Sequence, residues 1–376
     1  MYQKIDDYVL QLVRDSTPER TVWNMEKIRA GQQASWNYID GCMLTALMEM
    51  ARITGEERYS DFVRECIDHF VTQEGEIRTF KPEDSNLDDI NEGRVLFELY
   101  DSTGQEKYRK AAAFLREQLE KHPRTAEGNF WHKAIYPNQV WLDGIYMAQP
   151  FYALYEKHFG SGDYADTVGQ IKNVRARMFS REKGLYYHGY DATRSIFWAD
   201  PDTGCSKNFW LRSLGWFAVA LADLLEILPD GEQRSSLADI FTELIFSIDR
   251  YADPDTGLFW QVPDQGGREG NYLETSGSAM IAYATLKGAR LGYLDKEYAA
   301  KGRKTFNGIM DKYLTFTDSG ELNLGGICLV AGLGPENNRR RDGSYEYYIS
   351  EPVVKNDAKG VAPFVLAYTE IKRLKA

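Results

Sequence analysis

The chain has 376 residues, of which 43% are hydrophobic and 27% charged, proportions that are typical of a globular protein. Its net charge of −11 argues against nucleic acid and against an anionic membrane surface as partners. No apolar run approaches the roughly 20 residues that span a bilayer, and the N-terminus lacks a signal-peptide hydrophobic run. The four cysteines lie far apart without a CxxC pair, so they indicate neither a disulfide framework nor a zinc site. We therefore expect a reduced, cytoplasmic protein.

Six apolar segments recur along the chain, each behind a short aromatic stretch and each with a glycine near its start. They are predicted as helices over residues 36–50, 87–100, 141–155, 209–225, 272–286 and 356–366. Their glycines align in one column, namely Gly41, Gly93, Gly144, Gly215, Gly277 and Gly360. Intervals of about 50 to 80 residues indicate that one supersecondary unit is repeated.

Between these segments lie six more charged helical stretches, as QEKYRKAAAFLREQLEK illustrates with apolar residues at spacings of three and four. They are predicted over residues 3–14, 57–71, 105–121, 163–178, 232–249 and 296–313. Alternating outer and inner helices make six hairpins, and a closed ring gives every inner helix two neighbours. The sequence therefore predicts an all-α barrel, and because no Pro-, Gly- or Ser-rich linker divides the chain, residues 1–376 are predicted to form a single domain.

The loops that lead into the inner helices share one style, with a glycine followed by alternating aromatics, as in KGLYYHGYD. Such segments are predicted as tight turns with short extended pieces. Because loops at one face of a rigid scaffold usually carry function, we expect the site at this mouth of the barrel.

Asp143 is the first candidate for chemistry, since it lies between Trp141 and Gly144 at the start of an apolar helix. A carboxylate at a helix start is often only a cap that satisfies the backbone. Here the aromatic neighbour would withdraw the carboxyl partly from water, which suits a general acid. Asp88 and Asp89 occupy the matching place one repeat earlier, where a cap and a partner acid for Asp143 both remain open.

The densest motif, SKNFWLRSLGWFAVAL, brings Trp210, Arg212 and Trp216 within seven residues of one inner helix. Arg212 either forms a structural ion pair or aims its guanidinium at a substrate carboxylate between indole rings. Among five histidines, His132 (beside Lys133) and His188 fall in the aromatic loops.

Other motifs are weaker. Arg339, Arg340 and Arg341 form a solvated loop or an anion clamp, two alternatives that stay open. The paired aspartates of the DPDTG segments indicate turns, because no full loop of calcium ligands follows. The sequence contains no P-loop, GxGxxG or GxSxG motif, so we expect neither a cofactor nor a metal.

WNYIDG (36–41), DDINEGR (88–94), FWHKAIYPNQVWLDGIYMAQPF (130–151), FWLRSLGW (209–216) and NDAKG (356–360) together resemble a known family. The chain is similar over nearly its whole length to the unsaturated rhamnogalacturonyl hydrolases, family 105 of the glycoside hydrolases, which are related to the unsaturated glucuronyl hydrolases of family 88. The resemblance implies an (α/α)6 barrel that removes a terminal 4,5-unsaturated uronic acid from pectin fragments by hydration of the vinyl ether.

By the same resemblance, Asp143 protonates C4 and assists a water at C5, and Asp88 is the second acid of the site. Positions around the anionic sugar are implied for Tyr38, Lys133, Trp141, His188, Trp210, Arg212 and Trp216. Two alternatives stay open, namely an unsaturated glucuronyl hydrolase acting on other polysaccharide fragments and a non-catalytic sugar-binding barrel. The oligomeric state is not predicted.

Overall fold

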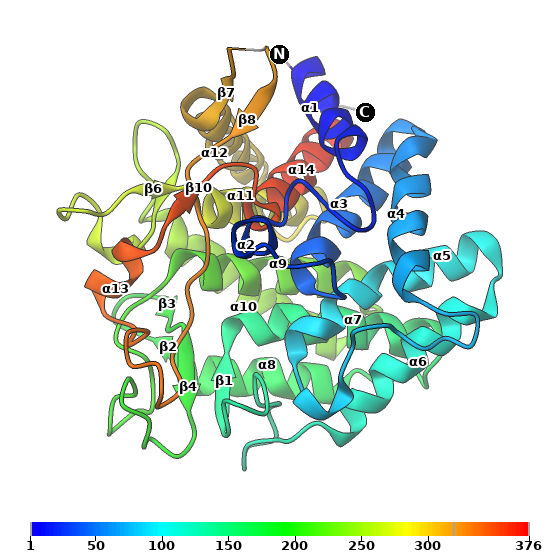
Figure 1. Cartoon of the computed structure of the whole chain (residues 1–376). Coiled ribbons are helices and arrows are strands. Elements are labelled where there is room, and N and C mark those ends of the chain that lie inside the picture. The colour runs from blue at the N-terminus through cyan, green and yellow to red at the C-terminus, as the bar shows by residue number, and fades with distance from the viewer. Residues whose placement is uncertain (1, 319, 375–376) are drawn as a thin grey trace.

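Six inner helical staves stand side by side in a closed ring in the computed structural model, which describes residues 2–318 and 320–374 (Figure 1). The staves are α3 (Tyr38–Thr54), η2 (Leu87–Val95) continued by α5 (Leu96–Thr103), α7 (Leu142–His158), α9 (Leu211–Ile227), α11 (Thr275–Arg290) and α14 (Ala358–Arg373). Each stave packs on the next in chain order, and α14 packs back on α3. The predicted ring of inner helices is therefore confirmed.

Six outer helices alternate with these staves. They are α1 (Gln3–Arg14), α4 (Glu57–Phe70), α6 (Glu106–Lys121), α8 (Ala165–Met178), α10 (Glu232–Asp249) and α12 (Lys296–Tyr313). Their amphipathic pattern places one stripe inward, as in α6, where Tyr108, Ala112, Leu115 and Leu119 are fully buried. Two short helices that the sequence did not predict, α2 (Met25–Ala30) and α13 (Tyr345–Ser350), lie in the connecting segments.

The second stave differs from its prediction as a single helix over residues 87–100. It begins with the 3₁₀ segment η2 and becomes α-helical only at Leu96. This segment packs on both α3 and α7, and a Cβ at Gly93 would meet Leu115 at 2.3 Å and Phe151 at 2.9 Å. Because these close contacts come from distant parts of the chain, local helix periodicity does not reveal the tighter winding.

The glycine column marks the places where staves approach most closely. A Cβ at Gly41 would lie 2.6 Å from the Cα of Glu92, and one at Gly215 would lie 2.8 Å from the Cβ of Met280. A Cβ at Gly277 would likewise lie 2.4 Å from the Cγ of Leu211. Since real Cβ atoms do not approach so closely, the absence of a side chain at these positions lets neighbouring staves pack.

Ten short strands form five antiparallel pairs in the described residues, in the loops that join outer helices to inner ones. The pairs are β1 (Gln139–Trp141) with β4 (Gly189–Asp191), β2 (Phe179–Ser180) with β3 (Leu185–Tyr186), β5 (Phe259–Trp260) with β6 (Leu273–Glu274), β7 (Leu314–Phe316) with β8 (Leu322–Leu324), and β9 (Ile327–Cys328) with β10 (Val353–Val354). The extended pieces predicted from the aromatic loops are thus present. They gather at the end of the barrel where the inner helices begin.

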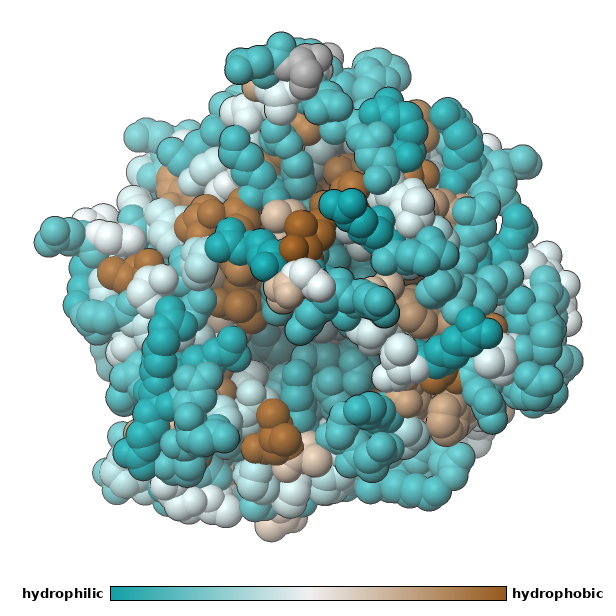
Figure 2. Space-filling view, in the orientation of Figure 1, coloured by the Kyte–Doolittle hydropathy of each residue, from teal (hydrophilic) through white to brown (hydrophobic). Residues whose placement is uncertain are grey.

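The viewed face of the molecule carries α2, α13, β1 and β4 (Figure 1). In the space-filling view this face is hollowed at its centre, with hydrophilic residues inside the hollow and hydrophobic ones at its rim (Figure 2). The mouth predicted from the loop pattern is therefore an open depression. Among the described residues, no helix has the length and apolarity that crossing a membrane requires.

Candidate active site

Asp143 lies in the first turn of α7, immediately after β1. The buried side chain of His188, the residue before β4, lies against it. Trp141 pairs with Gly189 across the two strands, and the Leu142 N–H donates to the His188 carbonyl at 3.1 Å. This pairing brings Nε2 of His188 to 3.2 Å from Oδ2 of Asp143. The His188 side chain is fully buried, whereas that of Asp143 keeps 13% of its surface exposed. The Asp143 carboxyl is therefore held on its protein side by His188 and remains partly open to solvent.

The other nitrogen of His188 is held by a tyrosine that the sequence did not single out. Nδ1 of His188 lies 2.7 Å from the hydroxyl of Tyr348 in α13. Burial raises the pKa of the Tyr348 phenol, as do the nearby Tyr347 and Asp143, so Tyr348 keeps its proton and can donate it to Nδ1. An imidazole that accepts at Nδ1 carries its proton on Nε2. Nε2 lies close to Oδ2 of Asp143, but the two atoms do not have hydrogen-bond geometry in this arrangement.

Asp88 is a charged acid at the start of η2, and its carboxylate is held by a lysine. Nζ of Lys133 lies 2.6 Å from Oδ2 of Asp88, and Nε2 of His132 lies 3.7 Å from Oδ1. Burial opposes ionisation of Asp88, but Lys133 and His132 outweigh it and hold the pKa below its usual range. The adjacent Asp89 behaves oppositely, because burial and the negative charge of Asp88 raise its pKa to about 7.

His132 lies between the two candidate acids and links them. Its ring stacks on Trp141 with centroids 4.2 Å apart, and both Asp88 and Asp143 act on it electrostatically. Burial lowers the pKa of His132 to about 4, a shift that the two acids oppose. A Cβ at Gly144 would lie 3.1 Å from its Nδ1, so the glycine that follows Asp143 makes room for this ring. The two repeats that carry Asp88 and Asp143 thus meet around a neutral histidine.

The two tryptophans predicted to flank the sugar are largely buried by protein partners. Trp141 is 6% exposed and has His132 on its ring, and Trp210 is 1% exposed, with Tyr348 stacked parallel to it at 6.1 Å. His188 lies 4.7 Å from the Trp210 ring. These indoles therefore hold the two histidines in place, and direct stacking of a sugar on them stays a prediction.

Arg212 lacks the structural ion pair, one of the two alternatives that the sequence left open. No acid of the described residues forms an ion pair with it; its Nη1 donates to the carbonyl of Cys328 at 2.6 Å and to Oγ of Ser276 at 3.3 Å. Its Nη2 donates to the carbonyl of Leu329 at 3.3 Å. The structural ion pair is therefore absent among the described residues, and binding of a substrate carboxylate by Arg212 stays a prediction. In the structure Arg212 holds the backbone carbonyls of Cys328 and Leu329.

Tyr38 and Trp216 differ in how near they lie to the acids. Tyr38 opens α3 and is half-buried; burial, Glu26 and Asp88 raise the pKa of its phenol, whereas Arg212 opposes the shift. Tyr38 therefore lies within electrostatic reach of Asp88. Trp216 stacks on Tyr146 at 4.4 Å inside the main hydrophobic core, so its contacts in the structure are those of a packing residue.

Other acids at the starts of inner helices are fully engaged by the protein. Asp40 accepts hydrogen bonds from Thr21, Trp23, Asn24 and Asn37. Glu274 accepts from the N–H groups of Gly277 and Cys328 and from the hydroxyl of Ser276. Asp357 caps α14 and pairs with Lys359. Capping therefore explains Glu274 and Asp357, and side-chain hydrogen bonds engage Asp40. Asp88 and Asp143 remain as the pair that faces the mouth.

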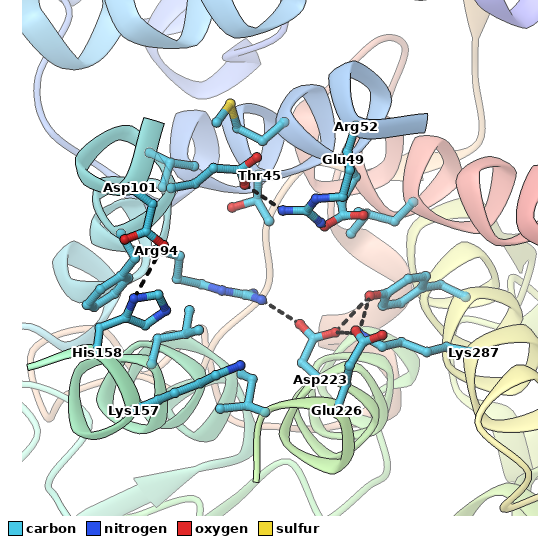
Figure 3. Close-up of a pocket in the computed structure, with 18 residues that line it drawn as sticks. Thr45, Glu49, Arg52, Arg94, Asp101, Lys157, His158, Asp223, Glu226 and Lys287 are labelled. Atoms are coloured by element: carbon cyan, nitrogen blue, oxygen red, sulfur yellow. Dashed lines mark hydrogen bonds and ion pairs between the residues drawn. The ribbon is translucent and has the colours of Figure 1, made fainter. Parts of the chain in front are cut away.

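A second cavity of 430 Å³ opens among the C-terminal halves of the inner helices, and no predicted site residue lines it (Figure 3). Arg94 extends across it to Asp223 at 2.6 Å, and Lys287 reaches Asp223 at 2.8 Å and Glu226 at 2.7 Å. These ion pairs link the second, fourth and fifth staves. This cavity is polar and lies at the end of the barrel opposite the mouth. Arg94 and Lys287 on its lining are paired with Asp223 and Glu226.

The described ranges, 2–318 and 320–374, hold no group of three or more His, Cys, Asp or Glu residues placed to bind a metal ion. All four cysteines are free and buried.

Comparison with known proteins decides the family. The sequence profile described as Glycosyl Hydrolase Family 88 matches residues 12–375. The chain belongs to this family. Membership of glycosyl hydrolase family 88 makes the chain a glycoside hydrolase and confirms the resemblance found in the sequence motifs.

Individual relatives support this assignment. A solved family 105 glycoside hydrolase from C. acetobutylicum is 38% identical, with a TM-score of 0.90 and 99% of each chain covered. The 24.9 kDa protein in picA locus of Rhizobium radiobacter is 40% identical over 228 residues, which are 60% of this chain and 97% of that protein. An unsaturated 3S-rhamnoglycuronyl hydrolase of Formosa agariphila is 27% identical over 181 residues, 46% of each chain. The barrel fold of the family 88 chain is thereby confirmed.

Proposed function

We propose that the chain removes the terminal 4,5-unsaturated uronic acid from rhamnogalacturonan oligosaccharides that a lyase has generated. Family membership supports the hydrolase class, and the name of the Formosa agariphila relative supports an unsaturated uronide linked to a rhamnose-containing glycan. The arrangement of two acids around His132, one of them backed by His188 and Tyr348, is the observation that carries the proposal.

The chemistry begins with a proton transfer from Asp143 to C4 of the unsaturated sugar. Protonation of the enol ether leaves positive charge shared by C5 and the ring oxygen, and the Asp88 carboxylate, which its lowered pKa keeps charged, stabilises that charge. The Asp143 carboxylate then takes a proton from the water that adds at C5. The resulting hemiketal opens, and the hemiacetal at C1 releases the second sugar as an alcohol.

His188 and Tyr348 contribute by fixing Asp143 through both steps. The N–H of His188 stabilises the carboxylate that forms when Asp143 loses its proton, and the hydrogen bond from Tyr348 sets the tautomer that makes this possible. Lys133 performs the corresponding task for Asp88. The proposed mechanism needs one acid that gives and regains a proton and one that stays charged.

The test is an assay on lyase-treated rhamnogalacturonan that follows the ultraviolet absorbance of the conjugated double bond. We expect the absorbance to decay and free rhamnose-ended product to appear. Asp143→Asn is expected to lower kcat by about a hundredfold or more, the contribution of general acid–base catalysis. The matched control is Asp239→Asn, a change of an exposed acid on outer helix α10, which should leave kcat unchanged.

Unsaturated glycosaminoglycan disaccharides form the second arm of this assay. Decay with these substrates alone would replace the rhamnogalacturonan assignment by a glucuronyl one. Binding without turnover of either substrate class, unaffected by Asp143→Asn, would identify a sugar-binding barrel and refute the proposed reaction.

A further inference from the structure

Three successive arginines lie in the long loop between β9 and α13, and their side chains have different partners in the structure. Arg339 is exposed and pairs with Glu336 at 2.6 Å. Arg340 pairs with the buried Glu351 at 2.7 Å. Arg341 is half-buried, and among residues 2–318 and 320–374 its side chain has no hydrogen-bond or ion-pair partner. One positive charge in this run is therefore left without a protein counter-ion.

The guanidinium of Arg341 lies beside the candidate active site. A Cβ placed on Gly332 would stand 3.3 Å from Nη1 of Arg341 and 3.4 Å from Cζ3 of Trp141, so both groups border the same point. Trp141 is two residues from Asp143, and its ring bears His132. Arg341 also acts electrostatically on Tyr347, the neighbour of Tyr348. The unpaired charge thus stands at the edge of the wall that holds the catalytic acids.

The loop that carries Arg341 is fixed to the same wall of the site. Leu333 is fully buried against Trp141 and Trp198, and the Trp198 indole N–H donates to the Gly334 carbonyl at 3.2 Å. The Gly334 N–H in turn donates to the carbonyl of Arg341 at 2.8 Å. A charged group on such a support loses little freedom when it binds a ligand.

Nearby acids do not neutralise this charge, because each already has a partner. Glu351 is engaged by Arg340, and Asp342 accepts from the Ser344 N–H and pairs with Lys207. At the mouth itself, Lys133 is paired with Asp88, and Arg212 donates to the carbonyls of Cys328 and Leu329. Arg341 is therefore the cation at the mouth, among the described residues, whose donors are all available.

We propose that Arg341 binds a carboxylate of the uronic-acid substrate, an inference that rests on the proposed function. A planar guanidinium with unused N–H groups matches a carboxylate in two parallel hydrogen bonds. The carboxylate belongs either to the unsaturated sugar at Asp143 or to a further uronate along the glycan. In both cases Arg341 is a binding and positioning residue, so its effect falls on the affinity for substrate.

The experiment measures KM and kcat for the unmodified protein, Arg341→Ala, Arg341→Lys and the control Arg339→Ala. Arg341→Ala is expected to raise KM about tenfold or more with kcat within about threefold, because the contact is made equally in the ground and transition states. Arg341→Lys keeps the positive charge but loses the two parallel hydrogen bonds of the guanidinium. Its KM should therefore lie between those of the unmodified protein and Arg341→Ala. Arg339→Ala, which removes an exposed pair, should match the unmodified protein.

Two substrates identify the carboxylate. A disaccharide whose one carboxylate is on the unsaturated sugar is compared with an oligosaccharide that carries a second uronate. A raised KM on both assigns Arg341 to the unsaturated sugar, and a raised KM on the longer glycan alone assigns it to the second uronate. Methyl esterification of the relevant carboxylate should abolish the difference between Arg341→Ala and the unmodified protein.

The outcomes separate this inference from the function on which it rests. Turnover by the unmodified protein, with equal KM values for Arg341→Ala and Arg339→Ala on both substrates, refutes the role of Arg341 and leaves the function intact. Absence of turnover by the unmodified protein on every unsaturated uronide refutes the function and the inference together. Circular dichroism and melting temperature confirm that each variant is folded.

Discussion

His188 and Asp143 lie 3.2 Å apart although they come from neighbouring repeats, and the β1–β4 pairing is what brings them together. The imidazole is fully buried and touches Tyr348 on its far side, so the candidate general acid is backed by a chain of two side chains. The orientation of Asp143 therefore depends on a hydroxyl in a helix far along the sequence.

Tyr348→Phe should lower kcat by roughly tenfold with little change in KM. The substitution keeps the stacked ring but removes the donor to Nδ1, so His188 no longer favours the tautomer with its proton on Nε2, the ring nitrogen nearest Asp143. The control is Tyr345→Phe, which removes a hydroxyl that donates to the carbonyls of Arg268 and Glu269, away from the acids. Steady-state kinetics distinguish the two, and equal kcat values for both variants would contradict the proposed relay.

Asp88→Asn and Asp89→Asn should differ strongly at pH 6 although they change adjacent residues. Asp88 has a lowered pKa and is charged at this pH, whereas Asp89, with a pKa of about 7, is mostly protonated. Replacing the charged carboxylate removes the stabilising charge and leaves Lys133 unpaired, so we expect kcat/KM to fall about a hundredfold.

The same change at Asp89 substitutes one neutral group for another and should alter kcat/KM by less than about threefold. The measurement is kcat/KM at pH 6 on the preferred unsaturated disaccharide. A larger effect from Asp89→Asn than from Asp88→Asn would reverse the two assigned roles.

Gly277→Ala should destabilise the barrel by about 1–3 kcal/mol through overpacking. The added methyl would lie 2.4 Å from Cγ of Leu211 and 3.0 Å from its backbone carbonyl carbon, where α11 meets α9. Gly169→Ala on outer helix α8 is the matched control, because a Cβ there meets nothing within 4 Å. It should stabilise the protein by about 0.5–1 kcal/mol. Urea unfolding of both variants measures the difference, and equal effects would contradict the close approach of the staves.

Asp223→Asn should destabilise the protein by about 3–5 kcal/mol at pH 7, because Arg94 and Lys287 would lose their shared buried counter-ion. Burial opposes ionisation of Asp223, but these two cations lower its pKa to about 2, from an ordinary value of 3.8. A carboxyl with a depressed folded pKa contributes stability that is complete above about pH 4 and is lost as the pH falls toward 2.

The free energy of unfolding, measured from pH 7 to pH 2, tests this sign. The unmodified protein should lose stability between pH 4 and pH 2, and the slope in that interval should be smaller in Asp223→Asn. A variant that keeps the full slope would show that other carboxyls carry it.

Much of the fold could be predicted because its signals are local. Apolar helices with a leading glycine and amphipathic helices with one buried stripe each repeat within about 20 residues, so periodicity identifies both sets. The 3₁₀ winding of η2 was missed since it depends on packing against α3 and α7. That the whole chain forms one domain stays a prediction.

The residues of the candidate site likewise fall into those that a sequence motif marks and those that only the fold brings together. Asp88, Lys133, Asp143 and His188 were found from motifs and lie around one mouth. Tyr348 was missed because 160 residues separate it from His188 and no short motif marks the pair. The partners of Arg212 were missed for a similar reason, since backbone carbonyls carry no signature in the sequence.

The contact between α14 and α3 has a consequence for how the molecule is made in the cell. Each inner helix buries apolar side chains against the inner helices on both of its sides. The helix that closes the ring, α14 (Ala358–Arg373), comes after the other five in the chain. While the polypeptide emerges from a ribosome, the apolar sides of α3 and α11 stay uncovered until that segment is translated. Closure of the ring is therefore late, and we expect nascent chains halted before residue 358 to bind chaperones and to aggregate once released.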